Sequence, residues 1–554
     1  MAPSLGVVHM ADVDSIVIGS GAGGLAAALA LAQAGQKVVV LEQHEVPGGW
    51  CHSFTLEGYK FSPGVHYIGE LEPGGRARAI YEGLGVANDL AFCELNPDGY
   101  DHIHIGSERF DIPKGCAAFA DRLKSRFPHE AAGIDGYLRD VERMGAELGE
   151  LFDLHGLGDL LRLPFKSRTV ARWGLRSAKS LIAHHVRDPR VRAIFAAQSG
   201  DHGLPPSMAP AAVHASVTAH YLKGGYYPRG GAFVLPRAFH RALKRAGGEL
   251  RLNTRVEKIL VENRRAIGVR LVDGTEIRAN HVISNADPEV TFGKLVGREH
   301  LSRVMRFRLD RTRYSVSCLS LFMAVDMDVR AAGLDSGNVW YYRDTDVEGI
   351  YRNGLTASGL EAGTPPGQFL TVTTLKDPSK HQKGHHTMES FAFVGYDAFR
   401  RWAHTHFGAR PADYAEMKKV LLDKMLAGVE RFVPGLKSHV VFADLATPLT
   451  NEHYCVATRG NLYGIEKGRM QVGPLSYPVK TELDGLSMVG ASTLSHGVMG
   501  ATISGLVAAQ QILHCRMRDV LRAQGQTVRI FPSEQPQAWV PSRRAAIVEE
   551  ELRA

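Results

Sequence analysis

Short apolar runs separated by glycines dominate the first fifty residues of the chain. Residues 15–18 predict a short buried strand, and the Ala/Leu-rich stretch after Gly24 predicts a helix. A second apolar run, Lys37–Leu41, predicts the next strand. This order of strand, glycine turn, helix and strand is typical of a βαβ unit with two parallel strands.

The glycine turn of this unit has the spacing of a dinucleotide-binding motif. Gly19 permits the tight turn, Gly21 lets the backbone approach a pyrophosphate, and Gly24 lets helix and strand pack closely. Gly23 is counted with them as cofactor-binding, because the helix start offers unpaired N–H groups to a phosphate. Glu42, 18 residues after Gly24, ends the second strand and is placed to accept from a ribose hydroxyl. The motif predicts a dinucleotide site, with a βαβ unit that binds no dinucleotide as the alternative.

Further strands are predicted in two groups. The first is a compact group at Glu249–Asn253, Val256–Glu262, Ala266–Leu271, Glu276–Arg278 and His281–Ser284. The second alternates strands at Cys318–Val325, Phe369–Thr374 and Met388–Val394 with a helix at Pro411–Phe432. A last strand, Asp484–Ala491, precedes a Gly/Ala-rich helix at 497–513.

The length of 554 residues favours at least two domains. We expect FAD-binding parts at 14–75, 226–300 and 446–513. A mostly helical substrate segment, 76–225, and a substrate domain, 301–445, separate them, and a loosely packed tail, 514–554, follows. Six scattered cysteines without metal spacing predict neither a disulfide framework nor a metal site.

Membrane-spanning segments are not predicted. The two most apolar stretches, Gly23–Ala34 and Gly497–Leu513, are shorter than the roughly 20 residues that a spanning helix needs. The first residues lack the basic and apolar regions of a signal peptide. We therefore expect a cytoplasmic protein, with membrane association, if any, at the periphery.

The positive charge is concentrated between residues 155 and 192. Nine Lys/Arg against two acids give this segment +7, numerically the whole net charge. Trp173 and several leucines are interleaved with the basic residues, as in surfaces that lie on anionic lipid headgroups. A solvated basic face of ordinary helices is the alternative. Nothing resembles a nucleic-acid-binding motif, so no nucleic-acid partner is expected.

The later segments resemble flavoprotein oxidoreductases of the glutathione-reductase-like fold. Glu42 is followed by the pair Gly48 and Gly49, where that fold passes close to the flavin diphosphate. Val256 occupies the strand that passes under the adenine, and Val282–Asp287 resembles the strand that returns to the cofactor. Gly490, before the helix at 497–513, resembles the closing motif of the site. The resemblance implies FAD and an α/β fold, in which a Rossmann domain is joined to a second sheet-bearing substrate domain and a helical membrane-facing segment.

Two loops resemble the retinol saturase and carotenoid isomerase branch of the phytoene desaturase superfamily. They are the stretch Gly64–Gly69 after Phe61-Ser62-Pro63, and Pro448–Asn451 with Arg459–Gly464. The resemblance covers about residues 14 to 513. It implies saturation, desaturation or isomerisation of carbon–carbon double bonds in a long apolar polyene such as a retinoid or carotenoid. It also implies a substrate tunnel that opens toward a membrane.

The chain departs from this branch at two places. Trp50 stands where many relatives have Arg or Lys, so a phosphate contact there is lost. Ala491 and Ser492 follow Gly490 where relatives often have an acid or Gln that meets the ribityl chain. That contact is therefore either lost or moved to Ser492 or Thr493.

The catalytic candidates are two histidines and a tyrosine. His66 and Tyr67 follow Gly64 in a loop that the fold brings near the flavin, where His66 can exchange a proton with a polyene carbon. His496 precedes the last helix and is expected at the flavin edge. The alternatives are a buried, hydrogen-bonded histidine for His66 and a helix-entry role for His496.

Residues expected in the substrate chamber are Tyr341, Tyr342, His453 and Tyr454, with core packing as the alternative for each. Cys51 is expected to be an inert core residue.

Several functions stay open on sequence grounds. The same chemistry on a fatty-acyl or other lipid chain, a flavin amine oxidase, and a non-enzymatic prenyl-lipid chaperone of the GDP-dissociation-inhibitor type are the rivals. A second glycine motif is missing, so a saturase would take electrons from a partner or soluble donor, and a desaturase would pass them to an acceptor.

Overall fold

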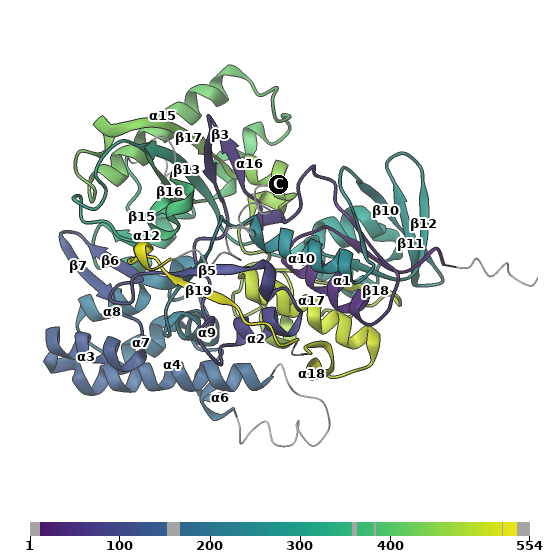
Figure 1. Cartoon of the computed structure of the whole chain (residues 1–554), viewed down its shortest axis with the longest axis horizontal. Coiled ribbons are helices and arrows are strands. Elements are labelled where there is room, and N and C mark those ends of the chain that lie inside the picture. Colours follow the sequence, from purple (N-terminus) through teal and green to yellow (C-terminus); the bar gives the residue numbers. More distant parts are fainter. Residues whose placement is uncertain (1–10, 152–166, 357–362, 382–383, 523, 540–554) are drawn as a thin grey trace, which may run out of the picture.

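Two seven-stranded sheets form the frame of the molecule, and helices cover both (Figure 1). The computed structural model describes residues 11–151, 167–356, 363–381, 384–522 and 524–539. A three-stranded sheet and a two-stranded hairpin complete the strands of these residues. The α/β class expected from the sequence is confirmed.

The first sheet is built around the predicted βαβ unit. Strands β1 (Val13–Ile18) and β2 (Val38–Leu41) run parallel, with Ile16 opposite Val39. β12 (Glu276–Ser284) pairs parallel with the other side of β1, and β18 (Leu486–Met488) pairs parallel with β12. The order is β10-β11-β12-β1-β2-β9, with β10 (Val256–Glu262), β11 (Arg265–Leu271) and β9 (Glu249–Arg251).

Two strand assignments from the sequence are wrong. The run at 249–253 was grouped with the strands that follow it, but β9 pairs parallel with β2 at the opposite edge of the sheet. The runs 276–278 and 281–284 form the single strand β12, whose first half pairs with β11 and whose second half pairs with β1. Alternation in sequence predicts strands, but it does not predict which neighbour each strand will find.

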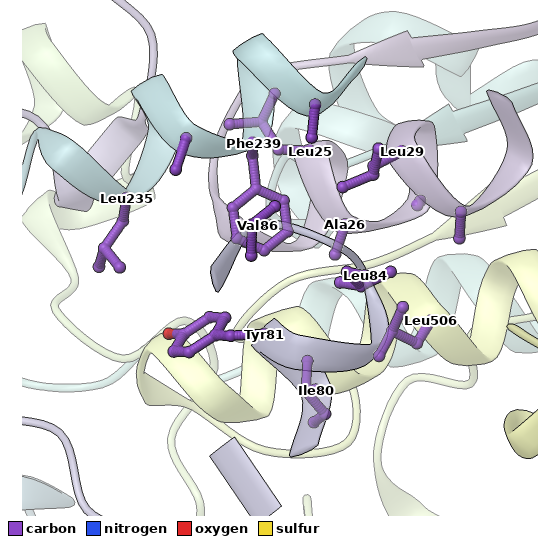
Figure 2. Close-up of a cluster of buried hydrophobic side chains, with 14 of the residues drawn as sticks. Leu25, Ala26, Leu29, Ile80, Tyr81, Leu84, Val86, Leu235, Phe239 and Leu506 are labelled. Atoms are coloured by element: carbon purple, nitrogen blue, oxygen red, sulfur yellow. The ribbon is translucent and has the colours of Figure 1, made fainter. Parts of the chain in front are cut away.

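Helices α1 (Ala22–Gln33) and α17 (Gly497–Leu513) lie against each other beside this sheet. Both helices are confirmed, and α1 is buried on nearly all sides. A Cβ atom on Gly505 would overlap the carbonyl oxygen of Gly23, so the two backbones touch at this glycine pair. Figure 2 shows Leu25 and Leu29 of α1 packed with side chains of α2 (Arg76–Gly83), α10 (Val234–Arg245) and α17.

The second sheet has the order β17-β13-β16-β15-β14-β6-β7. Its strands are β17 (Val440–Ala446), β13 (Ser317–Val325), β16 (His386–Val394), β15 (Gly367–Val372), β14 (Asn338–Tyr342), β6 (Asp101–Ile105) and β7 (Glu108–Ile112). β14 and β6 pair in parallel, which joins residues near 100 to the substrate sheet. The predicted helix at 411–432 is observed as α15 (Ala412–Glu430).

Helices from the middle of the chain pack together below this sheet in the view of Figure 1. They are α3 (Cys116–Arg126), α4 (Ala131–Leu151), α6 (Arg168–Trp173), α7 (Ala178–His185), α8 (Pro189–Ala196) and α9 (Ala211–Tyr221). Among the described helices, none combines the length and apolar character that crossing a bilayer requires.

The expectation of a loosely packed tail is wrong for residues 529–532. They form β19 (Arg529–Pro532), which pairs parallel with β5 (Ala91–Glu94), and β5 pairs with β8 (Tyr226–Pro228). Arg229 lies over the rings of Phe531 and Trp539, at 4.9 and 5.1 Å from their centres. Cation–π contacts of this kind help to hold the tail on the body of the protein.

Candidate active site

One large cavity of about 1900 Å³ joins the two sheets. This is about twice the roughly 1000 Å³ upper range of ordinary ligand pockets. Its wall includes glycines of the βαβ unit, the loop at 63–70, and apolar residues of α6 and α9. The volume is large enough for a dinucleotide together with a second, long ligand.

Glu42 is held in place by the glycine turn that it faces. Its Oε2 accepts hydrogen bonds from the backbone N–H and the hydroxyl of Ser20, at 2.9 and 2.6 Å. Its Oε1 accepts from the backbone N–H of His44 at 3.0 Å. A carboxylate offers about four acceptor positions, so one remains for a hydroxyl of a bound ribose. Glu42 lines the cavity, as its predicted role requires.

The four glycines of the turn fall into two pairs. Gly19, with a φ of +90°, and Gly21 line the cavity. Gly23 and Gly24 lie behind them and permit close packing, because a Cβ atom on Gly24 would overlap the carbonyl oxygen of Gly19. Gly23 touches α17 instead of the cavity, so its contribution is to the packing that shapes the site.

The other predicted cofactor residues gather around the same cavity. Gly48, Gly49, Val256, Gly490 and Ser492 all lie in its wall. Thr493, the alternative to Ser492, donates its hydroxyl hydrogen to the carbonyl oxygen of Gly490 at 2.8 Å. Ser492 therefore remains the candidate for the ribityl contact.

Asn285 is a central residue that the sequence analysis did not single out. A Cβ atom on Gly21 would lie 2.5 Å from Nδ2 of Asn285, and one on Gly490 would lie 3.0 Å from its Oδ1. This Oδ1 is buried and has no hydrogen-bond partner within the described part of the chain. An orphaned acceptor in the wall, between two glycine turns, fits a polar ligand such as a dinucleotide.

His66 lies in the cavity wall between aromatic rings and a buried carboxylate. Its ring centre is 5.0 Å from that of Phe369 and 5.7 Å from that of Phe391. Its Nδ1 is 3.4 Å from Oε2 of Glu389, whose Oε1 accepts from the N–H of Ser62 at 2.7 Å. Burial lowers the pKa of His66, while Glu389 opposes that shift.

Lys376 is a buried cation behind the same loop. Its Nζ donates to the backbone oxygen of His66 at 2.6 Å and to Oδ1 of Asn338 at 2.5 Å. Burial lowers its pKa to about 7. The lysine thereby fixes the backbone that carries both predicted catalytic residues of this loop.

Tyr67 lies between two carboxyl groups. Its hydroxyl is 2.8 Å from Oδ2 of Asp201 and 3.2 Å from Oδ2 of Asp101, and its ring stacks on Tyr221 with centres 4.0 Å apart. Burial, with the two carboxyls, raises the pKa of Tyr67 well above its ordinary value. The phenol is therefore neutral across the physiological range.

His496, at the start of α17, is tied to the same aspartate. Its Nε2–H donates to the backbone oxygen of Asp201 at 2.9 Å, since a carbonyl can only accept. Burial, and then the nearby Lys467, lower the pKa of His496 to about 4. The structure thus brings His66, Tyr67 and His496 into one cavity wall.

The chamber residues expected from the sequence divide differently. Tyr454 lines the cavity, whereas Tyr341, Tyr342 and His453 lie outside its wall. Tyr341 stacks on Phe432, and His453 stacks on Phe407 at 4.3 Å between ring centres. Aromatic character alone does not separate a chamber wall from a core.

Cys51 is buried in the cavity wall. Burial raises the pKa of its thiol to about 12, which fits an inert side chain. No group of three metal-ligating side chains occurs within the described ranges.

The branch-typical loop at 459–464 acts as a connector. Asp287 at the end of β12 accepts hydrogen bonds from the N–H and hydroxyl of Thr458, at 2.8 and 3.0 Å. Tyr463, within the loop, donates its hydroxyl hydrogen to the carbonyl oxygen of Gly200 at 2.8 Å. This loop links the dinucleotide sheet to the segment that carries Asp201.

The basic segment predicted to face a membrane is described only from residue 167 onward, and 155–166 lie outside the described residues. Trp173, Leu181 and Ile182 are buried in the helical layer, so these apolar side chains do not form a lipid-facing surface. Leu175 is 64% exposed and lines the cavity. Arg172 and Arg176 lie over the outer side of Trp173, at 5.1 and 5.2 Å from the ring centre.

A family model for flavin containing amine oxidoreductases matches residues 22–513. The match spans most of the chain, and the chain therefore belongs to this family of flavoproteins. FAD is its cofactor, and it is an FAD-dependent oxidoreductase. This membership favours an enzyme over the chaperone alternative.

Two kinds of relatives resemble the chain over nearly its whole length. All-trans-retinol 13,14-reductase of Danio rerio is 29% identical over 528 residues, which cover 91% of this chain and 86% of the relative. Chloroplastic prolycopene isomerase of Daucus carota is 28% identical over 526 residues, which cover 92% of this chain and 81% of the relative. The resemblance to the retinol saturase and carotenoid isomerase branch is confirmed.

Solved structures share the fold. An oxidoreductase from Methanosarcina mazei matches with a TM-score of 0.61 at 16% identity, covering 90% of this chain and all of that one. A putrescine oxidase bound to putrescine matches with a TM-score of 0.58 at 16% identity, covering 91% and 99% of the two chains. At these identities the likeness concerns the fold alone.

Proposed function

We propose that this enzyme saturates or isomerises carbon–carbon double bonds of a long polyene, a retinoid or carotenoid. The observation that carries the proposal is the single cavity, which extends from the dinucleotide glycines to apolar side chains of α6 and α9. The relatives named for all-trans-retinol and prolycopene support the same substrate class.

The cofactor is assigned to the residues that the motifs identified. Gly19 and Gly21 at the start of α1, with Gly48 and Gly49, would contact the diphosphate, and Glu42 the ribose. Val256 would lie under the adenine. Gly490, Ser492 and the N-terminus of α17 close the other end of the site, where the helix dipole stabilises negative charge. Bound FAD supplies hydride chemistry, so the chain itself must place the substrate and handle a proton.

The wall around His66 suits an apolar chain better than an amine. Phe369 and Phe391 stack with ring centres 4.6 Å apart and flank His66. Flat aromatic faces of this kind accept a conjugated chain by stacking. Neutral His66 is the proposed proton acceptor in isomerisation, where a proton added to the polyene must be removed again. Tyr67 is the neutral phenol beside the chain, and His496 is a positioning residue for Asp201.

The exposed part of the basic segment is proposed to rest on an anionic membrane surface. Leu175 lies both at the molecular surface and in the cavity wall, and Arg168, Arg172, Arg176 and Lys179 are exposed around it. A membrane at this place would deliver a lipid-soluble substrate directly to the cavity. A partner or soluble electron donor, or an acceptor, completes the proposed reaction.

Mass analysis of the product tests the function. The purified holoprotein, reduced without oxygen by a soluble two-electron donor, is incubated with all-trans-retinol, with a poly-cis carotenoid, and with an unsaturated fatty acid. Saturation adds two hydrogens to a polyene, and isomerisation changes its retention time without changing its mass. The polyene proposal would be refuted if the enzyme converted only the fatty acid. It would also be refuted if a protein with its full FAD content converted none of the three substrates.

A further inference from the structure

The two carboxyl groups on Tyr67 need more hydrogens than the phenol has. Three oxygen atoms lie in a row: Oδ2 of Asp201, the Tyr67 hydroxyl oxygen and Oδ2 of Asp101, with separations of 2.8 and 3.2 Å. Two hydrogen bonds in a row need two hydrogens, and a tyrosine hydroxyl carries one. If both carboxyls were ionised, one anionic oxygen would face the phenol oxygen in a buried site, which is costly.

The extra proton has a preferred position, because the two carboxyls have different surroundings. Asp101 is fully buried and accepts from Asn338 Nδ2 and Gln198 Nε2, each at 3.0 Å, as well as from Tyr67. Lys376 Nζ donates a hydrogen bond to Oδ1 of the same Asn338. Hydrogen-bond donors and a nearby cation favour the ionised form of Asp101.

Asp201 has Tyr67 as its side-chain partner among the described residues, and it lines the cavity. Burial, and then the negative charge of Asp101, raise the pKa of Asp201 well above its ordinary value. The pKa of Asp101 itself is raised only to about 6. The hydrogen-bond pattern is therefore Asp201 O–H to Tyr67 oxygen, and Tyr67 O–H to Asp101.

The groups that face this pair from neighbouring elements do not reverse the assignment. They are Lys376 and the phenols of Tyr100, Tyr221, Tyr342, Tyr351 and Tyr463, with His496 on the backbone of Asp201. Burial raises the pKa of all five phenols, so they stay neutral, and of the two aspartates Lys376 acts on Asp101.

We propose that Asp201 is the acid of this enzyme, stored in its protonated form by Tyr67 and Asp101 and presented to the substrate in the cavity. This assignment rests on the proposed function. In saturation, bound reduced FAD would supply the hydride for one new C–H bond. The π electron pair of the double bond forms the second by taking the proton of Asp201. Asp201 is left as a carboxylate and regains a proton from water after the product leaves.

Infrared spectroscopy of the holoprotein tests the stored proton without any substrate. The wild type is expected to show the carbonyl band of a protonated carboxyl at about neutral pH, shifted by D₂O. Asp201→Asn is expected to lose this band, and Tyr67→Phe to shift it. Asp335→Asn, which changes a carboxyl outside the cavity, is the matched control and is expected to retain it. Absence of the band in the wild type, or its survival in Asp201→Asn, would overturn the proposal.

Turnover supplies the second test. Asp201→Asn is expected to keep its FAD and to lose roughly 100-fold or more of the single-turnover saturation rate, in the range of acid–base catalysis. Asp101→Asn is expected to displace the alkaline limb of the pH–rate profile. Unchanged rate and profile in both variants would contradict the assignment. If the wild type converts no polyene although the infrared result holds, the proposed function fails while the protonated Asp201 stands.

Discussion

Glu42 accepts two hydrogen bonds from one residue, Ser20, through the backbone N–H at 2.9 Å and the hydroxyl at 2.6 Å. The carboxylate that is expected to hold the ribose therefore also fixes the conformation of the glycine turn. Binding of the cofactor and the shape of its phosphate site depend on the same side chain.

Replacing Glu42 by Gln is expected to weaken FAD binding by about 10- to 100-fold, because charged hydrogen bonds contribute about 1.5–3 kcal/mol. The amide has one oxygen for three donors and brings an N–H₂ group toward them. Titration of the apoprotein with FAD, followed by flavin fluorescence, measures the change. Glu45→Gln, an exposed position three residues further on, makes the same charge change and should bind like the wild type. Equal affinities for the two variants would remove Glu42 from the cofactor site.

Glu389 is expected to orient His66, whose Nδ1 lies 3.4 Å from it. His66→Asn should lower the rate of isomerisation by about 100-fold or more while FAD stays bound, since it removes the proposed proton acceptor. Glu389→Gln should lower turnover less. It should also shift the acid limb of the pH–rate profile to lower pH, because Glu389 raises the pKa of His66. Rates across pH, with flavin absorbance as the control for cofactor content, separate these effects. A His66→Asn enzyme with full turnover would leave His66 as a structural residue.

Gly505 permits the contact between α17 and α1, and Ala is expected to be too large there. Its Cβ atom would overlap the Gly23 carbonyl oxygen, and overpacking of this kind costs about 1–3 kcal/mol. Thermal unfolding should show a lower midpoint and earlier release of FAD. Gly293→Ala is the matched control, because the three atoms nearest to its new Cβ all belong to the movable side chain of Glu289. Destabilisation of the control to the same extent would show that the effect does not come from the α1–α17 contact.

Acid is expected to destabilise the protein through its buried histidines. Burial lowers the pKa of His214 and of His496 to about 4, while both regain the ordinary value of 6.5 on unfolding. Between these values the unfolded chain binds more protons. Stability is therefore full above about pH 6.5 and falls toward pH 4, by about 1.4 kcal/mol per pH unit for each histidine.

Urea unfolding at several pH values measures this slope. His496→Gln keeps a donor for the Asp201 carbonyl. This variant should reduce the slope of stability against pH by the contribution of one histidine, about 1.4 kcal/mol per pH unit. The exposed His184 gives the matched variant, His184→Gln, for which the wild-type slope is expected. A slope unaffected by His496→Gln would contradict the assignment.

Membrane binding is expected to depend on Arg172 and Arg176. Changing both to Glu should weaken sedimentation with anionic vesicles strongly, because each basic residue near such a surface contributes about 1 kcal/mol. Arg400→Glu with Arg401→Glu is the matched control, since Arg401 also lies over a tryptophan, at 3.8 Å from the ring centre of Trp402. Equal vesicle binding by the two double variants would exclude 168–179 as the docking surface.

Local patterns predicted cofactor residues that the structure gathers around one cavity. Gly19, Gly21 and Glu42 lie close together in the sequence, so their arrangement is encoded in one βαβ unit, whereas α17 (Gly497–Leu513) was found through its own glycine motif at the other end of the chain. The carboxyl pair was missed, because Asp101 and Asp201 lie 100 residues apart in elements without a motif and meet only through Tyr67. Three of the four expected chamber residues lie outside the cavity wall, because aromatic character does not say which space a ring faces: Tyr341 and Tyr342 are buried elsewhere, and His453 is exposed.

The first sheet draws its strands from widely separated parts of the chain, with β1 at residue 13 and β18 ending at residue 488. The pairing of β12 with β18 must wait for residues near the end of the chain, so completion of this half is expected to be slow and late. During that interval the edge of β12 that β18 later covers needs protection from other chains. The cofactor, by joining segments at both ends of the chain, is well placed to trap the completed sheet as it forms.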